Sequence, residues 1–226
     1  MAFDQILTAI SEENAVFVAP VVPISRMNRT YAGDKIYLGF FKPLQSGRWI
    51  GNIKRYALDD SGILYDAIGA EACTADGLIK DNALSFWTIL GNDGPDVEKG
   101  GAAEILDLLI DSPTARNLFT YTGVVADLTN TANAFVYSNA DITDGELGVA
   151  SGAERTDLFN AVHEGRLGDI IHSEPSVVHY PDPDGNPATD DGKTLIYAAS
   201  NDGILHAFDD ADGSEIWGFI APSQLG

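Results

Sequence analysis

The sequence predicts a mainly β fold, made of antiparallel sheets of the kind that form β-propeller blades, with a few short helices in insertions. Two observations predict it. Between residues 165 and 220, three apolar runs are separated by the glycine turns Asn201-Asp202-Gly203 and Asp210-Ala211-Asp212-Gly213. Glycine supplies the positive φ angle that a tight hairpin turn requires. A related stretch at 35–66 predicts a second copy of the same sheet-forming unit.

The apolar runs predict strands at 194–199, 204–208 and 215–220. A tryptophan near the outer end of such a unit is typical of a propeller blade, and we expect Trp217 to dock onto a neighbouring blade. The acidic turn before it, at 209–215, is predicted to close a hairpin rather than to bind a metal.

The repeat rests on two correspondences: residues 35–39 parallel 195–199, and residues 55–60 parallel 205–210. Repeated units of this kind stack on one another. The alternative is two unrelated hairpins that share ordinary turn chemistry.

Several short groups of residues follow one another in a characteristic order from about residue 15 to the end. They are IYLGFFKP (36–43), WIGNIKRY (49–56), SFW (85–87), DG (93–94), GGAA (100–103), RNLFTY (116–121), LGDIIHSEP (167–175) and NDGILHAF (201–208). The ordered set resembles the propeller region of the PilY-type proteins, the adhesins and biogenesis factors of the type IV pilus tip. A single strand-Asp-Gly-strand-Trp unit also occurs in quinoprotein propellers, whereas the whole ordered set is specific to the PilY-type proteins.

The resemblance implies that residues 1–226 are the N-terminal part of the family's C-terminal β-propeller region. Blades would lie at about 35–66 and 165–220, with a helical and loop insertion at about 98–163. It also implies a non-enzymatic protein outside the cell, at the pilus tip or the outer-membrane surface. Such a protein controls pilus assembly and retraction with calcium, and its partners are pilins, minor pilins, and host or abiotic surfaces.

Two departures from the family shape these expectations. The family's proteins are longer and secreted, whereas Met1-Ala2-Phe3-Asp4 shows no signal peptide. We therefore expect a fragment of a longer protein. An exposed blade edge has unpaired backbone groups, so we also expect self-association through such edges.

Composition limits the partners and the chemistry. With 34 acidic and 13 basic side chains, the formal net charge of −21 argues against binding to nucleic acid or anionic lipid. No apolar run is long enough for membrane insertion. Cys73 is the single cysteine, so an intramolecular disulfide and a metal site built on several thiolates are excluded.

Helices are predicted in three places: 3–10, 102–110 and 154–162. The middle one has strong helix formers with apolar residues three to four apart, and Asp111-Ser112-Pro113 ends it. Residues 117–150 are predicted to form strands and polar loop. The helices are interpreted as packing elements.

A metal site is predicted at 182–191, where four aspartates and one asparagine stand within ten residues. Asp182, Asp184 and Asn186, with Asp190 closing the loop, offer the oxygen ligands that Ca²⁺ prefers. Pro187 and Lys193 occupy the places where an EF-hand requires Gly and Glu, so the loop is not an EF-hand. The alternative is a solvated turn rich in Asp, Pro and Gly.

The histidines gather in the last third of the chain, at 163, 172, 179 and 206. Asp169, His172 and Ser173 are too close along one extended stretch to form a catalytic triad. We expect His172 and His206 to hydrogen-bond loop backbone, and we predict no catalytic residue and no organic cofactor.

Two other function classes remain open. One is a quinone-dependent dehydrogenase, which would bind quinone with an optical spectrum. The other is a general extracellular binding propeller with no link to pili. Co-purification with pilins distinguishes the pilus protein from this last class.

Overall fold

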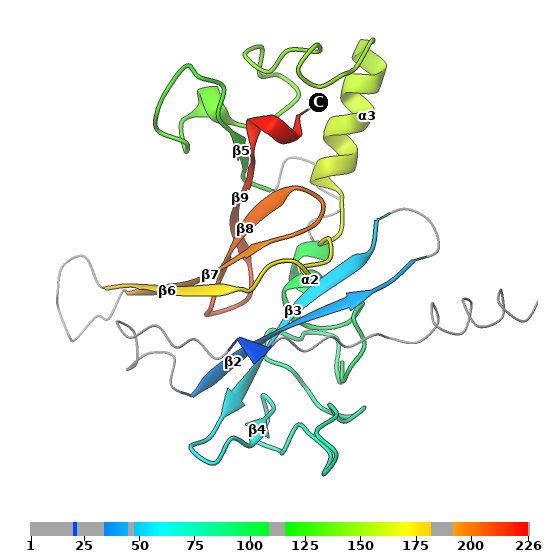
Figure 1. Ribbon diagram of the computed structural model, residues 1–226, viewed down its shortest axis with the longest axis vertical. Helices are drawn as coiled ribbons and strands as arrows, with labels where there is room; N and C mark the ends of the chain where they lie inside the picture. Colours follow the sequence, from blue (N-terminus) through cyan, green and yellow to red (C-terminus); the bar gives the residue numbers. More distant parts are fainter. Residues whose placement is uncertain (1–19, 22–33, 45–47, 109–115, 182–191, 226) are drawn as a thin grey trace, which may run out of the picture.

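The computed structural model describes residues 20–21, 34–44, 48–108, 116–181 and 192–225, which form two β-sheets with a few short helices (Figure 1). The first sheet contains β1 (Pro20–Val21), β2 (Lys35–Lys42), β3 (Ile50–Leu58) and β4 (Leu64–Tyr65). These strands are neighbours in that order, and every pair is antiparallel. The prediction of a mainly β chain is confirmed.

The second sheet has the order β5-β9-β8-β7-β6. Four of its strands form an antiparallel meander: β6 (Ser176–Tyr180), β7 (Lys193–Ala199), β8 (Ile204–Asp209) and β9 (Glu215–Ile220). The three strands predicted here agree with β7, β8 and β9 to within one residue. A short strand from the insertion, β5 (Leu118–Thr120), joins the far side of β9 in parallel. The closure of such sheets into a propeller stays a prediction.

Two of the predicted helices are present, with changed limits. Helix α2 spans Gly101–Asp107 and reaches its C-cap at Leu108, so the helix ends before the predicted residue 110. Helix α3 spans Gly152–His163, and the Ser151 side chain caps it by accepting a hydrogen bond from the Glu154 amide. None of the described helices has the length and apolarity that crossing a membrane requires. The predicted helix at 3–10 lies outside the described residues.

The insertion between these helices is mostly turns. Its described part, 116–150, contains β5 and a 3₁₀ turn, η1 (Thr131–Asn133), and the expectation of several strands there is wrong. The amide side chains of Asn133 and Asn139 bond to nearby backbone carbonyls and hold the turns together. A second 3₁₀ turn, η2 (Pro222–Gln224), follows β9.

The two sheets share one apolar cluster, with α2 between them (Figure 1). Tyr37 and Ile53 of the first sheet meet Ile196, Ala198 and Phe208 of the second in this cluster. The opposite face of the first sheet is covered by residues from the 66–100 segment, chiefly Ala72, Ala83 and Val97. A third cluster packs α3 and the insertion on the far end of the second sheet, around Leu118, Phe135, Ile142, Phe159, Ile204 and Ile220.

Glycine allows a close approach where the segment before β6 crosses the first sheet. A Cβ on Gly51 would overlap the carbonyl group of Gly168, and one on Gly39 would lie 2.8 Å from the side chain of Ile170. The Gly51 amide donates to the Leu167 carbonyl at 2.8 Å, which pairs this segment with the start of β3, whereas β4 pairs with the end of β3. The absence of side chains at these two positions therefore lets the LGDI segment lie against the sheet.

Candidate functional site

The predicted calcium ligands Asp182, Asp184, Asn186 and Asp190 lie outside the described residues. The structure describes both ends of their loop: β6 ends at Tyr180 and β7 begins at Lys193, directly opposite it in an antiparallel pair. Within the described ranges, no group of three or more His, Cys, Asp or Glu is placed to hold a metal ion. The calcium site stays a prediction.

Asp210, in the turn between β8 and β9, makes a polar contact between the two sheets. Its carboxylate accepts hydrogen bonds from Lys35 Nζ at 2.5 Å, Tyr37 Oη at 2.6 Å and Arg55 Nη1 at 2.8 Å. All three donors belong to the first sheet, and Arg55 Nη1 also donates to the Asp210 carbonyl at 2.6 Å. One aspartate thus joins β2 and β3 to the second sheet with charge-assisted bonds.

Trp87 completes this junction. Its indole Nε1 donates to the Asp210 carbonyl at 2.9 Å, and its ring stacks on Tyr37 with centroids 6.1 Å apart. Trp87 has φ +73°, a strained region for a bulky residue, and a Cβ on Gly213 would lie 2.7 Å from its ring. The junction therefore holds Trp87 in a strained backbone conformation, and its ring fits against the 210–213 turn because Gly213 has no side chain.

Electrostatics agree with this geometry. Burial alone would raise the pKa of Asp210, but the bonds from Lys35 and Tyr37 and the nearby Arg55 charge outweigh it and lower that pKa. Burial, and then the bond to Asp210, raise the pKa of Tyr37 well above its usual range. Asp210 is therefore the anion of this junction, and Tyr37 is a neutral donor.

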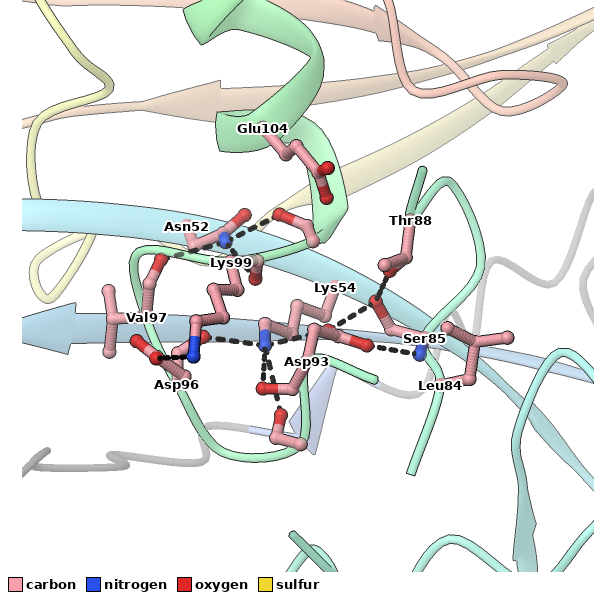
Figure 2. A network of polar contacts seen from close by, with 12 residues as sticks. Asn52, Lys54, Leu84, Ser85, Thr88, Asp93, Asp96, Val97, Lys99 and Glu104 are labelled. Atoms are coloured by element: carbon pink, nitrogen blue, oxygen red, sulfur yellow. Dashed lines mark hydrogen bonds and ion pairs between the residues drawn. The ribbon is translucent and has the colours of Figure 1, made fainter. Parts of the chain in front are cut away.

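A second buried charge, Lys54 of β3, lies on the other face of the first sheet (Figure 2). Its side chain has no exposed surface, and Nζ lies 2.7 Å from the equally buried Asp93 carboxylate. Nζ also donates to the carbonyls of Gly94 at 2.9 Å and Asp96 at 2.7 Å. The 93–96 loop thus surrounds the ammonium group with oxygen atoms, as a loop surrounds a bound cation.

Neighbouring side chains fix the same loop. Asn52 Nδ2 donates to the carbonyls of Val97 and Gly100, both at 2.9 Å, and its Oδ1 accepts from the Ala103 amide at the start of α2. Asp93 also accepts from the amide and the hydroxyl of Ser85, each at 2.8 Å. Burial lowers the pKa of Lys54, and the Asp93 carboxylate opposes that shift. The Asp93 carboxylate and the loop carbonyls, and not solvent, therefore stabilise the ammonium group of Lys54.

The second sheet has its own buried network around Glu215 of β9. Arg116 donates two bonds to this carboxylate, from Nε at 2.7 Å and Nη2 at 2.8 Å, and a third from Nη1 to the Val162 carbonyl of α3. His206 Nδ1 lies 2.7 Å from Glu215 Oε1. Burial alone would raise the pKa of Glu215, but Arg116 and His206 outweigh it and lower that pKa to about 2.

His206 continues the network to Ser200, whose Oγ lies 2.8 Å from Nε2. A serine, a histidine and a glutamate in this order have the connectivity of a hydrolase triad. The amides that would have to stabilise an oxyanion there already have partners: Ser200 N donates to the Ile204 carbonyl and Asn201 N to the Asp169 carbonyl. Ser200 Oγ also contacts the Asp202 carboxylate, and His206 has no exposed surface. These contacts support a structural role.

The expectation that His172 and His206 bond to loop backbone is wrong. His206 bonds to the side chains of Ser200 and Glu215, and His172 Nδ1 lies 3.1 Å from Asn201 Oδ1. The backbone role belongs to His163, whose Nε2 lies 2.7 Å from the Phe135 carbonyl. Asp169 and Ser173 bond elsewhere, to the side chain of Asn201 and to the Ala199 amide.

Cys73 has no disulfide partner and lies beside an apolar hollow of about 750 Å³ on the first sheet, together with Ile36, Leu38, Leu64, Leu78 and Ile79. Burial raises the pKa of its thiol, and Lys80 opposes this. A raised pKa makes the thiolate, the reactive form, scarcer at neutral pH.

Three comparisons with known proteins place this structure in context. No protein-family model matches the chain, and no solved structure matches it. Among curated proteins, the chain is 25% identical over 245 residues to the type IV pilus biogenesis factor PilY1 of Pseudomonas aeruginosa (strain UCBPP-PA14). The chain is distantly similar to a type IV pilus protein. The match covers 97% of this chain and 19% of PilY1, so the chain spans about a fifth of that protein's length.

Sequence reasoning missed the residues that hold this structure together. It treated the turn at 209–215 only as a hairpin closure, which it is, since the Gly213 amide donates to the Asp209 carbonyl. It gave no role to Lys54, Arg116 or Glu215. The one available signal was that Lys54 stands within a largely apolar predicted strand, WIGNIKRY (49–56), where a basic side chain can be buried.

Proposed function

We propose that this chain is part of a non-enzymatic protein of type IV pili that acts outside the cell, at the pilus tip. There it takes part in pilus assembly, in the control of retraction and in adhesion to surfaces. The observation that carries the proposal is the similarity to PilY1, which extends over 97% of this chain. The ordered residue groups that resemble the PilY type lie between residues 36 and 208, within the same region of similarity.

The structure supports a binding role in a further way. Asp210, Lys54 and Glu215 each bond to groups that hold sheets, loops and helices together. The acidic surface suits a protein that works in solution and meets other proteins rather than nucleic acid. Pilins and minor pilins are the proposed partners.

The test is co-purification from the organism that encodes this chain. An affinity-tagged copy, expressed there, should carry pilins or minor pilins with it, and the same preparation from a strain without pilins is the control. Recovery of the chain without any pilin would contradict the pilus role and favour the general binding propeller. A bound quinone with its optical spectrum would favour the dehydrogenase.

Calcium regulation is the second part of the proposal, with Asp182, Asp184, Asn186 and Asp190 as ligands. The chemistry of the donors supports it, because carboxylate and amide oxygens are the ligands of Ca²⁺. The loop joins two adjacent strands of the second sheet, so an ion bound there would connect the ends of β6 and β7.

Calorimetric titration of the chain with Ca²⁺ tests this part. We expect saturable binding that is abolished when Asp182, Asp184 and Asp190 are changed to Ala. A matched control changes the exposed Asp60, Asp76 and Asp157 to Ala, which removes the same charge elsewhere. Equal loss in both triple variants, or no binding by the original chain, would reduce the loop to an acidic turn.

A further inference from the structure

Lys54 and Asp93 form an ion pair from which water is excluded. Neither side chain has any exposed surface, and Lys54 Nζ lies 2.7 Å from the Asp93 carboxylate (Figure 2). The ring of Phe40 bounds the site, with its centroid 5.1 Å from Nζ. An uncharged lysine amine is a nucleophile, and burial lowers the pKa of Lys54, which favours that form. The pair therefore places a nucleophile beside a carboxyl carbon in a site without solvent.

The two oxygens of the Asp93 carboxyl group have different surroundings. Oδ1 accepts a hydrogen bond from the Ser85 amide at 2.8 Å. Oδ2 accepts one from the Ser85 hydroxyl, also at 2.8 Å, and faces Lys54 Nζ. An amide that points at one oxygen stabilises the negative charge that develops there when a nucleophile adds to the carbon. A hydroxyl donor and an ammonium group at the other oxygen favour its protonation and departure.

We propose that Lys54 and Asp93 join in an intramolecular isopeptide bond. Lys54 Nζ passes one proton to Asp93 Oδ2, and the uncharged amine adds to Cγ while negative charge develops on Oδ1, opposite the Ser85 amide. Nζ then gives a second proton to Oδ2. The Cγ–Oδ2 bond breaks as the Nζ–Cγ bond becomes an amide, and the oxygen leaves as one water molecule. The step is a condensation and requires no oxidant, reductant or co-reactant.

Positioning favours the bonded form. Two groups held in contact react as if each met the other at a concentration of about 10⁵–10⁸ M. Lys54 is fixed by strand β3, and Asn52 fixes the loop through its bonds to the carbonyls of Val97 and Gly100. The N–H that remains in the amide has an acceptor, the Asp96 carbonyl, which lies 2.7 Å from Nζ. Exclusion of solvent protects the product from hydrolysis.

The bond would connect β3 covalently to the 93–96 loop, so that the 66–100 segment stays on the first sheet when the chain is pulled. Other ion pairs of similar length are hydrated. In the same loop, Lys99 Nζ lies 3.0 Å from the Asp96 carboxylate, but the Lys99 side chain is 65% exposed. Exclusion of water, and not distance alone, therefore distinguishes the buried pair. The inference does not depend on the pilus role.

Mass spectrometry of the intact, denatured chain tests the proposal. We expect the mass to be lower than the sequence requires by one water molecule. Trypsin should leave Lys54 uncut, because its amine is blocked, and should release a branched peptide in which residues 49–55 are joined to residues 81–99. Lys54→Met should have the full mass of its own sequence. Ser85→Ala should slow bond formation in freshly synthesised chain by at least about tenfold.

A matched control is Lys99→Met, which removes the exposed ion pair of the same loop and should keep the mass loss and the branched peptide. Circular dichroism establishes that each variant is folded. A succinimide at Asp93-Gly94 would give the same mass loss within the single peptide 81–99, and the digest separates the two products. A wild-type chain of full mass, or a mass loss without the branched peptide, would overturn the proposal.

Discussion

The first and second sheets each fix an irregular segment through one buried charge on a strand, and the signs of the two charges are opposite. In the first sheet the strand supplies the cation, Lys54, and the 93–96 loop supplies the oxygens. In the second sheet the strand supplies the anion, Glu215, and the segment before β5 supplies Arg116. In each sheet, the sign of the buried charge on the strand is opposite to that of the groups that the packed segment provides.

The reason lies in what each segment offers. The loop around Lys54 turns several carbonyls inward, and carbonyl oxygens can only accept hydrogen bonds, so they need a donor with several protons. Arg116 has to contact a strand and a helix at once, and its planar guanidinium group donates to Glu215 and to the Val162 carbonyl. The compact ammonium group of Lys54 therefore suits the 93–96 loop, and the planar guanidinium group of Arg116 suits the contact between β9 and α3.

The largest expected effect is in the first sheet. Lys54→Met leaves the Asp93 carboxylate buried without a cation, so we expect the free energy of unfolding to fall by about 3–5 kcal/mol, measured by urea denaturation. The control Lys99→Met removes the exposed ion pair with Asp96 in the same loop and should change stability little. Equal effects from both variants would contradict a buried cation that holds the loop.

In the second sheet, the buried anion Glu215 should make the free energy of unfolding depend on pH. The pKa of Glu215 in the folded chain is about 2, against 4.5 as the ordinary value. A carboxyl group with a lowered folded pKa contributes its stability fully above the unfolded pKa and loses it as pH falls through the folded pKa. Glu215 should therefore contribute about 3 kcal/mol that is lost between about pH 4.5 and pH 2.

Glu215→Gln tests this contribution. The variant should be less stable than the original chain at neutral pH, and the difference should narrow as pH falls to about 2. Glu71→Gln makes the same change at an exposed residue and should keep the pH profile of the original chain. A difference between Glu215→Gln and the original chain that stays constant with pH would contradict the assignment.

A smaller loss in the free energy of unfolding is expected from a change at Asp210, where the two sheets meet. Asp210→Asn keeps the shape of the side chain but removes the charge that Lys35 and Arg55 share, so we expect a loss of about 1–3 kcal/mol. Asp212→Asn, in the same turn and exposed, is the control. Thermal unfolding followed by tryptophan fluorescence is a suitable measurement, because Trp87 bonds directly to the Asp210 carbonyl.

The sequence predicted local structure well where the turns contain glycine. Gly203 and Gly213, both at positive φ, lie in the turns that precede β8 and β9 and so define where these two strands begin. The parallel pairing of β5 with β9 could not be predicted, because it joins residues about a hundred positions apart and three residues carry little pattern. The earlier end of helix α2, at its C-cap Leu108, has no explanation in the local sequence pattern.

The polar clusters were harder to predict because their partners are distant in sequence. Asp210 was placed correctly in a hairpin turn, but its donors Lys35 and Arg55 lie more than 150 residues away. Lys54 stands in an alternating strand pattern, where a charged residue ordinarily faces solvent. Burial of that face by the 66–100 segment reverses the usual outcome.

The central claim, association with type IV pili under calcium control, is tested most directly by co-sedimentation with pili sheared from the organism that encodes this chain. We predict that the purified chain sediments with the pili and that Ca²⁺ changes the bound fraction. The change should disappear when Asp182, Asp184 and Asp190 are replaced by Ala and persist in the Asp60, Asp76 and Asp157 control. Sedimentation no greater than with material from a strain without pilins would contradict the account.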